Sequence, residues 1–242
     1  MSPIEANLQQ IHREKDAAIA GRPANLGQNL RQNVTLIAVS KTKPAAVILA
    51  AYQAGQRHFG ENYVQEGVAK VAECAALGLT GKQGLVWHFI GPLQSNKAKL
   101  VAHHFDWAHG VDRLKIAVAL STHRDSSMTP LNVCVQVNVS GEASKSGIDP
   151  KDALNFAAEI AALPNLNLRG LMTMIENTPD VATQRAQFQI MHTLWLTLQR
   201  HPPGSGMMID TLSMGMSQDF KVAIEEGATM IRIGSAIFGA RN

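Results

Sequence analysis

Several features that would place this chain in a specialised class of protein are missing from its 242 residues. Only two cysteines occur, Cys74 and Cys134, with no CxxC spacing and no histidine pair nearby. We therefore expect neither a disulfide framework nor a zinc site, and we interpret both as small buried side chains. The N-terminal segment lacks the apolar core of a signal peptide, and no run of roughly 18 apolar residues could span a membrane. The sequence thus predicts a cytoplasmic protein without membrane contact.

Charge is also scarce, because Asp, Glu, Lys and Arg make up 17% of the chain. The formal net charge is +3, but no lysine- or arginine-rich run concentrates it. Dispersed positive charge argues against a nucleic-acid partner and suits a small anionic ligand equally well. The apolar fraction of 45% is enough for a large core. No linker or low-complexity run divides the chain, so we treat residues 1–242 as a single domain.

Apolar, β-branched runs alternate with helical segments along the whole chain. This alternation predicts parallel strands joined by right-handed crossovers. Eight such units in this length fit a closed (β/α)₈ TIM barrel, an α/β fold, with an open doubly wound sheet as the alternative. Residues 1–30 add an N-terminal helical extension packed on the barrel, with its helix at 4–20. The expected strands cover residues 34–41, 57–62, 85–91, 105–111, 131–140, 166–174, 208–215 and 230–239.

Polar or glycine-rich clusters follow these strands, where a parallel barrel carries its functional residues. Because they converge on one mouth of the barrel, a ligand site is the natural hypothesis. The clusters lie at residues 40–44, 59–63, 88–91, 109–112, 138–142, 213–217 and 232–239.

Lys41 stands at the end of the first strand and shares its parity with Ile37 and Val39. A lysine at a barrel mouth can lose its proton through desolvation or a neighbouring cation and can then attack a carbonyl group. Lys43, two residues further on, is a candidate for that cation. The alternative is a solvated lysine pair that follows a strand.

The turns after the seventh and eighth strands occupy the place where barrels commonly bind phosphate. Gly215 lets the backbone approach a ligand closely, and Ser217 is expected to cap the helix that follows. Gly234 and Ser235 offer an N–H group and a hydroxyl. The alternative is ordinary turn chemistry without a ligand.

Three further residues carry two interpretations each. Arg232, at the end of the last strand, is suited to a phosphate or a ring nitrogen because its planar guanidinium always donates. His88, in an apolar strand, is either a ligand contact or a satisfied core histidine. Asn62 either binds a ring hydroxyl or caps the helix that begins at Tyr63. The alternative for Arg232 is an ion pair with Asp210, Asp219 or Glu225.

Taken together, several motifs resemble those of the pyridoxal phosphate homeostasis proteins. The resemblance runs from about Val34 to Arg241. The motifs that carry it are AVSKTKP, FGENYVQE, WHFIGPLQSNK, the SKSG of ASKSGID, RGLM, DTLSMGMSQDF and RIGSAIFGAR.

This resemblance implies a fold-type III barrel similar to the N-terminal domain of alanine racemase, with pyridoxal 5′-phosphate (PLP) as cofactor. It implies that PLP is held as a Schiff base on Lys41 and that Arg232 faces the pyridine nitrogen. The phosphate would be held by Ser217, Gly234 and Ser235, with a backbone contact from Met214. Asn62 and His88 would line the ring. Two departures from the family pattern are Thr173, where alanine is common, and Ser235, where threonine is common.

The catalytic machinery of a racemase looks incomplete, so no catalytic residue is assigned. A racemase needs a second acid/base on the opposite face of its substrate, and only Tyr52 and Tyr63 are present as tyrosines. The chain ends just after the eighth unit, so we expect no added domain to supply one. An arginine at the ring nitrogen also leaves PLP a weak electron sink.

The first hypothesis is therefore a non-catalytic protein of intracellular PLP homeostasis, which stores, buffers or delivers the cofactor. PLP-dependent apo-enzymes would be its partners, and the resemblance suggests a monomer. A PLP-dependent single-domain amino-acid racemase is the alternative. A third hypothesis is a cofactor-free Schiff-base aldolase that uses the same lysine.

Overall fold

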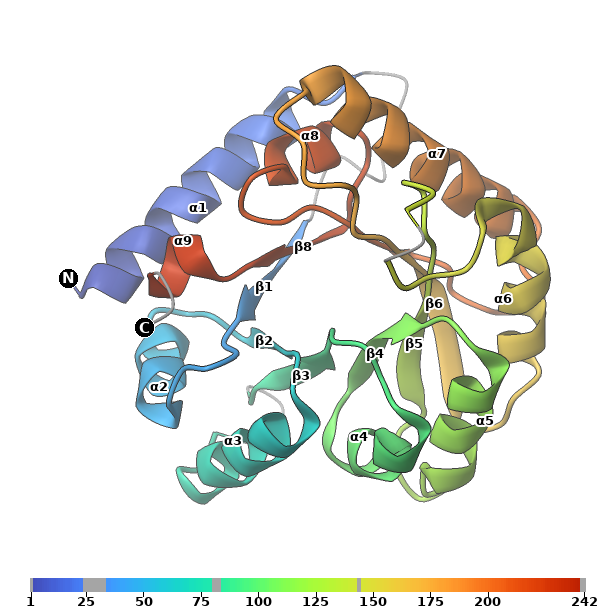
Figure 1. Ribbon diagram of the computed structural model, residues 1–242. Coiled ribbons are helices and arrows are strands. Elements are labelled where there is room, and N and C mark those ends of the chain that lie inside the picture. Colours follow the sequence, from blue (N-terminus) through green and yellow to red (C-terminus); the bar gives the residue numbers. More distant parts are fainter. Residues whose placement is uncertain (1, 24–33, 80–83, 143–144, 240–242) are drawn as a thin grey trace.

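The chain folds into a closed barrel of parallel strands (Figure 1). The structure is a computed structural model and describes residues 2–23, 34–79, 84–142 and 145–239. The first strand pairs with the second and also with the last, where Thr35 lies opposite Met230, so the sheet closes on itself. The predicted (β/α)₈ barrel is confirmed, and the open sheet is wrong. In order around the barrel the strands are β1 (Thr35–Val39), β2 (His58–Glu61), β3 (Val86–Phe89), β4 (Trp107–Val111), β5 (Leu131–Gln136), β6 (Leu166–Met172), β7 (Thr211–Ser213) and β8 (Met230–Ile233).

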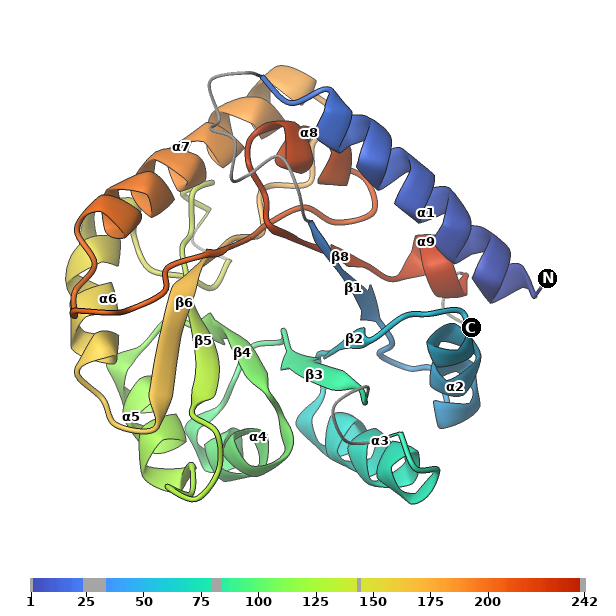
Figure 2. The ribbon, with the colours of Figure 1, turned by 180° about the vertical axis from the view of Figure 1, so that it is seen from behind.

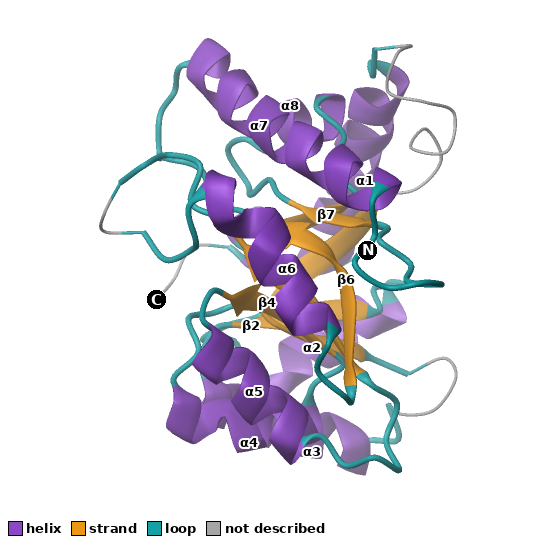
Figure 3. Cartoon of the chain, turned by 90° about the vertical axis from the view of Figure 1, so that its right-hand side faces the viewer, coloured by secondary structure: helices purple, strands orange, loops and turns teal. Residues whose placement is uncertain are grey.

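Helices cover the outside of the barrel, and the side view shows the strands between them (Figures 2 and 3). A helix after each strand lets the next strand return in the same direction. Two 3₁₀ turns, η3 (Ser95–Lys97) and η4 (Pro150–Asp152), precede α4 and α6. The helices are α1 (Pro3–Ala20), α2 (Ala45–Gln53), α3 (Val64–Ala76), α4 (Ala98–His104), α5 (Leu114–His123), α6 (Ala153–Ala161), α7 (Val181–Arg200), α8 (Phe220–Glu225) and α9 (Ser235–Phe238). Within the described residues, no helix combines the length and the apolar character needed to cross a bilayer.

Helix α1 is the predicted N-terminal helix, and its own sequence sets where it starts. The Ser2 hydroxyl accepts a hydrogen bond from the Glu5 N–H at 3.2 Å, and the Glu5 carboxylate accepts one from the Ser2 N–H at 3.3 Å. The helix packs against α8 and α9, where the Asn7 side chain donates to the Ile237 carbonyl oxygen at 2.9 Å. Residues 24–30 of the predicted extension lie outside the described residues.

Most of the predicted strands are too long at their carboxyl ends, although β4 ends at Val111 as predicted. Strand β5 ends at Gln136 and not near residue 140, and β7 covers only Thr211–Ser213. The predicted last strand divides into β8 and α9. Glycines and polar residues at these ends turn the chain out of the sheet, so the barrel mouth is lined by turns.

The helix predicted from Ser217 begins only at Phe220. The Asp219 carboxylate accepts the Met216 N–H at 2.5 Å, which closes a turn ahead of the helix. Asp219 is therefore the residue that precedes α8, and the expectation that Ser217 caps this helix is wrong. The Ser217 side chain is left available for the barrel mouth.

The barrel interior has its own apolar cluster, separate from the layer between strands and helices. It consists of Ile37, Trp107, Cys134, Met172 and Met230. Both cysteines are buried free thiols, as expected, and burial raises the pKa of Cys134 to about 12. They act as small apolar side chains.

Candidate functional site

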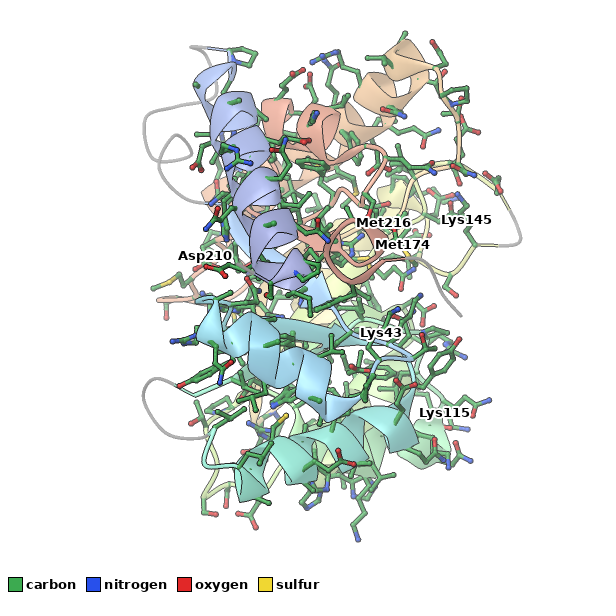
Figure 4. The ribbon with its side chains drawn as sticks, turned by 90° about the vertical axis from the view of Figure 1, so that its left-hand side faces the viewer. Lys43, Lys115, Lys145, Met174, Asp210 and Met216 are labelled. Atoms are coloured by element: carbon green, nitrogen blue, oxygen red, sulfur yellow. The ribbon has the colours of Figure 1, made fainter. Side chains whose placement is uncertain are left out.

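A cavity of about 190 Å³ opens where the strands end at the barrel mouth. Figure 4 shows Met174 and Met216 close together near Lys43, all at this end, while Asp210 lies at the opposite end of the barrel. The structure brings together most of the residues predicted to bind a cofactor. The predicted residues that line the cavity are Lys41, Asn62, Ser217, Arg232, Gly234 and Ser235.

A tight turn after β1 carries Lys41 to the cavity. The Lys43 N–H donates to the Ser40 carbonyl oxygen at 3.0 Å, which closes a four-residue turn with Lys41 second and Thr42 third. Val39, which shares the strand parity of Lys41, also lines the cavity. Lys43 lines the same cavity, so two amine-bearing side chains face one space.

Arg232 is the buried cation of this site. Its Nη1 donates to Ser213 Oγ at 2.7 Å, and its Nη2 donates to the Thr173 carbonyl oxygen at 2.7 Å. Burial lowers the pKa of Arg232 to about 10, so the guanidinium remains charged at neutral pH. The two hydrogen bonds fix its plane at the cavity wall.

Within the described residues, Arg232 makes no ion pair with Asp210, Asp219 or Glu225. Asp210 pairs with Arg169, and Glu225 pairs with Arg185. Asp219, the third candidate, uses its carboxylate to close the turn before α8. Burial lowers the pKa of Arg232 and the nearby charge of Asp219 raises it, but within the described residues Asp219 forms no ion pair with it, so the guanidinium can still meet an anionic ligand.

Two hydroxyls face each other where the turns after β7 and β8 meet. Ser235 Oγ lies 3.5 Å from Ser217 Oγ, and both residues line the cavity. Gly234 comes close to β1, because a Cβ on it would lie 3.2 Å from the Val39 carbonyl oxygen. Gly215, in contrast, has a φ of +96° and leaves room for α8, since a Cβ there would lie 2.7 Å from the Ala223 Cβ. Among the described residues Gly215 does not line the cavity, and its lack of a side chain lets α8 pack closely.

Asn62 carries a buried side-chain oxygen that faces the cavity region without a hydrogen-bond partner among the described residues. Its Oδ1 is buried and accepts no hydrogen bond among the described residues, and Asn62 lines the cavity. Helix α3 begins at Val64 with no side-chain cap. The capping interpretation of Asn62 is therefore wrong, and a ligand donor would satisfy its oxygen.

His88 and Met214 are not among the described residues that line the cavity. His88 is fully buried in the middle of β3, and the Met214 N–H already donates to the Met230 carbonyl oxygen at 3.1 Å. The Thr173 hydroxyl donates to the Val137 carbonyl oxygen at 2.8 Å. The Thr173 side chain, which departs from the family pattern, therefore points to the backbone and not into the cavity. Its neighbour Met174 lines the cavity instead.

A chain of hydrogen bonds leads from Ser213, the partner of Arg232, through the barrel interior. Ser213 Oγ lies 2.9 Å from His109 Nδ1, His109 Nε2 lies 2.9 Å from His88 Nδ1, and His88 Nε2 lies 2.9 Å from His58 Nδ1. Burial is the main cause that lowers the pKa of all three histidines, to about 3 for His109. Neutral imidazoles therefore make up this chain. This chain is not predicted from the sequence, although the histidines lie on the consecutive strands β2, β3 and β4.

Known proteins share both the sequence and the fold. Residues 16–242 match the family model of the alanine racemase N-terminal domain. The pyridoxal phosphate homeostasis protein of Vibrio cholerae is 52% identical over 242 residues, which cover 100% of this chain and 98% of the relative. The structure of PipY from Synechococcus elongatus without PLP has a TM-score of 0.80 and 37% identity, over 98% of this chain and 100% of that chain. The structure of PipY with PLP bound has a TM-score of 0.78 and 36% identity, with the same coverage.

The closed parallel barrel, with a lysine, a buried arginine and paired hydroxyls around its mouth, defines a protein of the alanine racemase N-terminal-domain class. Within this class, the chain belongs to the family of pyridoxal phosphate homeostasis proteins, since its identity to a member is 52% over the full length.

Proposed function

We propose that this chain binds PLP in the cavity, holds it as a Schiff base on Lys41, and stores, buffers or delivers it in the cell. The observation that carries the proposal is the gathering of Lys41, Arg232, Ser217 and Ser235 around one cavity. The name of the Vibrio cholerae relative and the PLP-bound structure of PipY support it.

The residues present fit this cofactor. PLP needs an amine for its aldehyde, a site for its phosphate and a partner for its ring nitrogen. Lys41, the Ser217–Ser235 pair and Arg232 would supply these in turn. Asn62 Oδ1 provides an independent test of fit, because a buried acceptor without a partner costs about 1–3 kcal/mol. The phenolic hydroxyl of PLP is a donor that would satisfy it.

Arg232 would also limit the chemistry of the bound cofactor, which supplies an electron sink to attached amines. A charged guanidinium that donated to the ring nitrogen would leave no room for a proton there. A neutral ring withdraws electrons less strongly. This arrangement favours binding and exchange of the cofactor over carbanion chemistry.

We propose further that the chain turns over no amino acid on its own. Tyr52 in α2 stacks on Arg57, with 4.0 Å between the guanidinium carbon and the ring centroid. Tyr63 precedes α3 with 55% of its surface exposed. Neither is among the described residues that line the cavity, so neither supplies the second acid/base of a racemase.

In this role the chain would act in the cytoplasm as a monomer and a single domain, residues 1–242. PLP-dependent apo-enzymes would be its partners, and neither nucleic acid nor membrane would be needed.

The test is to reconstitute the purified protein with PLP, record its visible spectrum, reduce it with borohydride and map the modified peptide by mass spectrometry. We expect a yellow band that bleaches on reduction, with the adduct on Lys41. Adducts spread over surface lysines, or no band, would refute the site. Loss of α-deuterium from any member of a panel of free amino acids would favour the racemase instead.

A further inference from the structure

The turn that carries Lys41 is strained. Thr42 has a φ of +64°, a left-handed conformation that β-branched residues rarely adopt. As the third residue of the turn closed between Ser40 and Lys43, it occupies a position that usually holds glycine or asparagine. Such a conformation persists only where the surrounding structure holds it in place.

An ion pair on α3 holds the two peptide groups on either side of Lys41. Lys70 Nζ donates to the Ser40 carbonyl oxygen at 2.6 Å, and Glu66 Oε1 accepts the Thr42 N–H at 2.5 Å. The same Glu66 oxygen lies 2.5 Å from Lys70 Nζ. Lys41 therefore lies between two anchors that belong to one i,i+4 pair of a single helix.

Glu61 fixes this pair from the barrel side. It is fully buried at the end of β2, and its Oε1 accepts hydrogen bonds from Lys70 Nζ at 2.9 Å and from Ser40 Oγ at 2.6 Å. The side chain of Lys70 is only 6% exposed, so its removal would leave a buried carboxylate without its cation. The side chain of Glu66 is 28% exposed, which makes it the better position for a substitution.

We propose that Glu66 and Lys70 are positioning residues that hold the strained turn so that Lys41, and not Lys43, reacts with the aldehyde of PLP. The inference rests on the proposed function, because it concerns the same amine. Schiff-base formation joins the amine nitrogen to the aldehyde carbon and releases the aldehyde oxygen as water, so the amine and the cofactor are the only reactants. Since Lys43 lines the same cavity, a relaxed turn would let it compete.

The experiment compares the full-length wild type with Glu66→Ala and Glu66→Gln. Glu73→Ala is the matched control, because Glu73 is an exposed glutamate about two turns further along α3. Each protein is incubated with PLP and reduced with borohydride, and the adducts on Lys41 and Lys43 are quantified by peptide sequencing in the mass spectrometer. Thermal unfolding of the cofactor-free proteins is measured in parallel, since a merely structural role would lower stability without changing the adduct ratio.

We expect the wild type and Glu73→Ala to carry the adduct on Lys41, and Glu66→Ala to lower the Lys41-to-Lys43 adduct ratio about tenfold. Glu66→Gln keeps an acceptor for the Thr42 N–H and should lower the ratio only about threefold. If Glu66→Ala does not fold, the adduct ratio of Glu66→Gln alone tests the positioning role.

A second substitution tests the role of strain. Thr42→Gly in the Glu66→Ala protein should restore much of the ratio, because glycine adopts a φ of +64° without steric cost. An unchanged ratio in both Glu66 variants, or no recovery with glycine, would overturn the positioning role. A wild type without an adduct on Lys41 would instead refute the proposed function.

Discussion

His109 allows a quantitative test of the neutral hydrogen-bond chain. Its imidazole is fully buried, and burial lowers its pKa from 6.5 to about 3. Below about pH 6.5 the unfolded chain takes up a proton at this position, whereas the folded chain does not until about pH 3. The unfolded state therefore binds more protons in this window, and folding stability is lost as the pH falls. Between about pH 8 and about pH 5 the loss from His109 alone is about 2 kcal/mol.

His109→Gln should remove this part of the pH dependence. The glutamine amide can still bond to Ser213 and His88, while it has no group that titrates in this range. Urea unfolding of the cofactor-free protein, followed by tryptophan fluorescence at both pH values, gives the free energy of unfolding. We expect the variant to lose about 2 kcal/mol less than the wild type over the interval. His123→Gln, at an exposed position in α5, is the control and should behave as the wild type does. Equal pH dependence in wild type and His109→Gln would refute the assignment of a neutral, buried imidazole.

Three further predictions follow from single contacts. Ser213→Ala leaves two buried polar groups, on His109 and Arg232, without their partner. We expect urea unfolding to show a free energy of unfolding lower by about 2–4 kcal/mol, against less than about 0.5 kcal/mol for the exposed control Ser127→Ala. Similar losses in the two variants would contradict this. Asn62→Ala should weaken PLP binding roughly fivefold in a spectroscopic titration without lowering the stability of the cofactor-free protein, and unchanged affinity would exclude the contact. Gly170→Ala should cost more than about 3 kcal/mol in the same urea assay, because a Cβ there would lie 1.8 Å from the Thr211 carbonyl oxygen; a stable variant would show that the backbone adapts.

The strand and helix order could be predicted from local pattern, but the element ends could not. Apolar residues recur at every odd position from 131 to 139, yet β5 ends at Gln136, because pairing with β6 ends there. Helix α8 starts at Phe220 and not near Ser217, because the Asp219 carboxylate accepts the Met216 N–H and closes a turn ahead of the helix. Hydrophobic periodicity reports which residues are buried in an element, and it carries little information about which of several polar side chains closes the turn.

Some residues of the candidate site could be predicted from the sequence, and others could not. Lys41, Ser217, Arg232 and Ser235 were identified from their places after strands and from the family motifs, and they line one cavity. The motif places His88 beside the ring, whereas in the structure His88 is fully buried, bonded to His109 at 2.9 Å, and not among the described residues that line the cavity.

By itself, then, the sequence determined the eight-unit barrel, the position of its mouth and the lysine and arginine that face it. These features depend on order along the chain and on the rule that parallel strands end on one side. Only the tertiary structure decided the partners of those residues: the three-histidine chain behind Arg232, the buried acceptor of Asn62 and the ion pair of α3 that holds the Lys41 turn. The residues of each group come from different strands and helices. They come within hydrogen-bonding distance only when the barrel has folded.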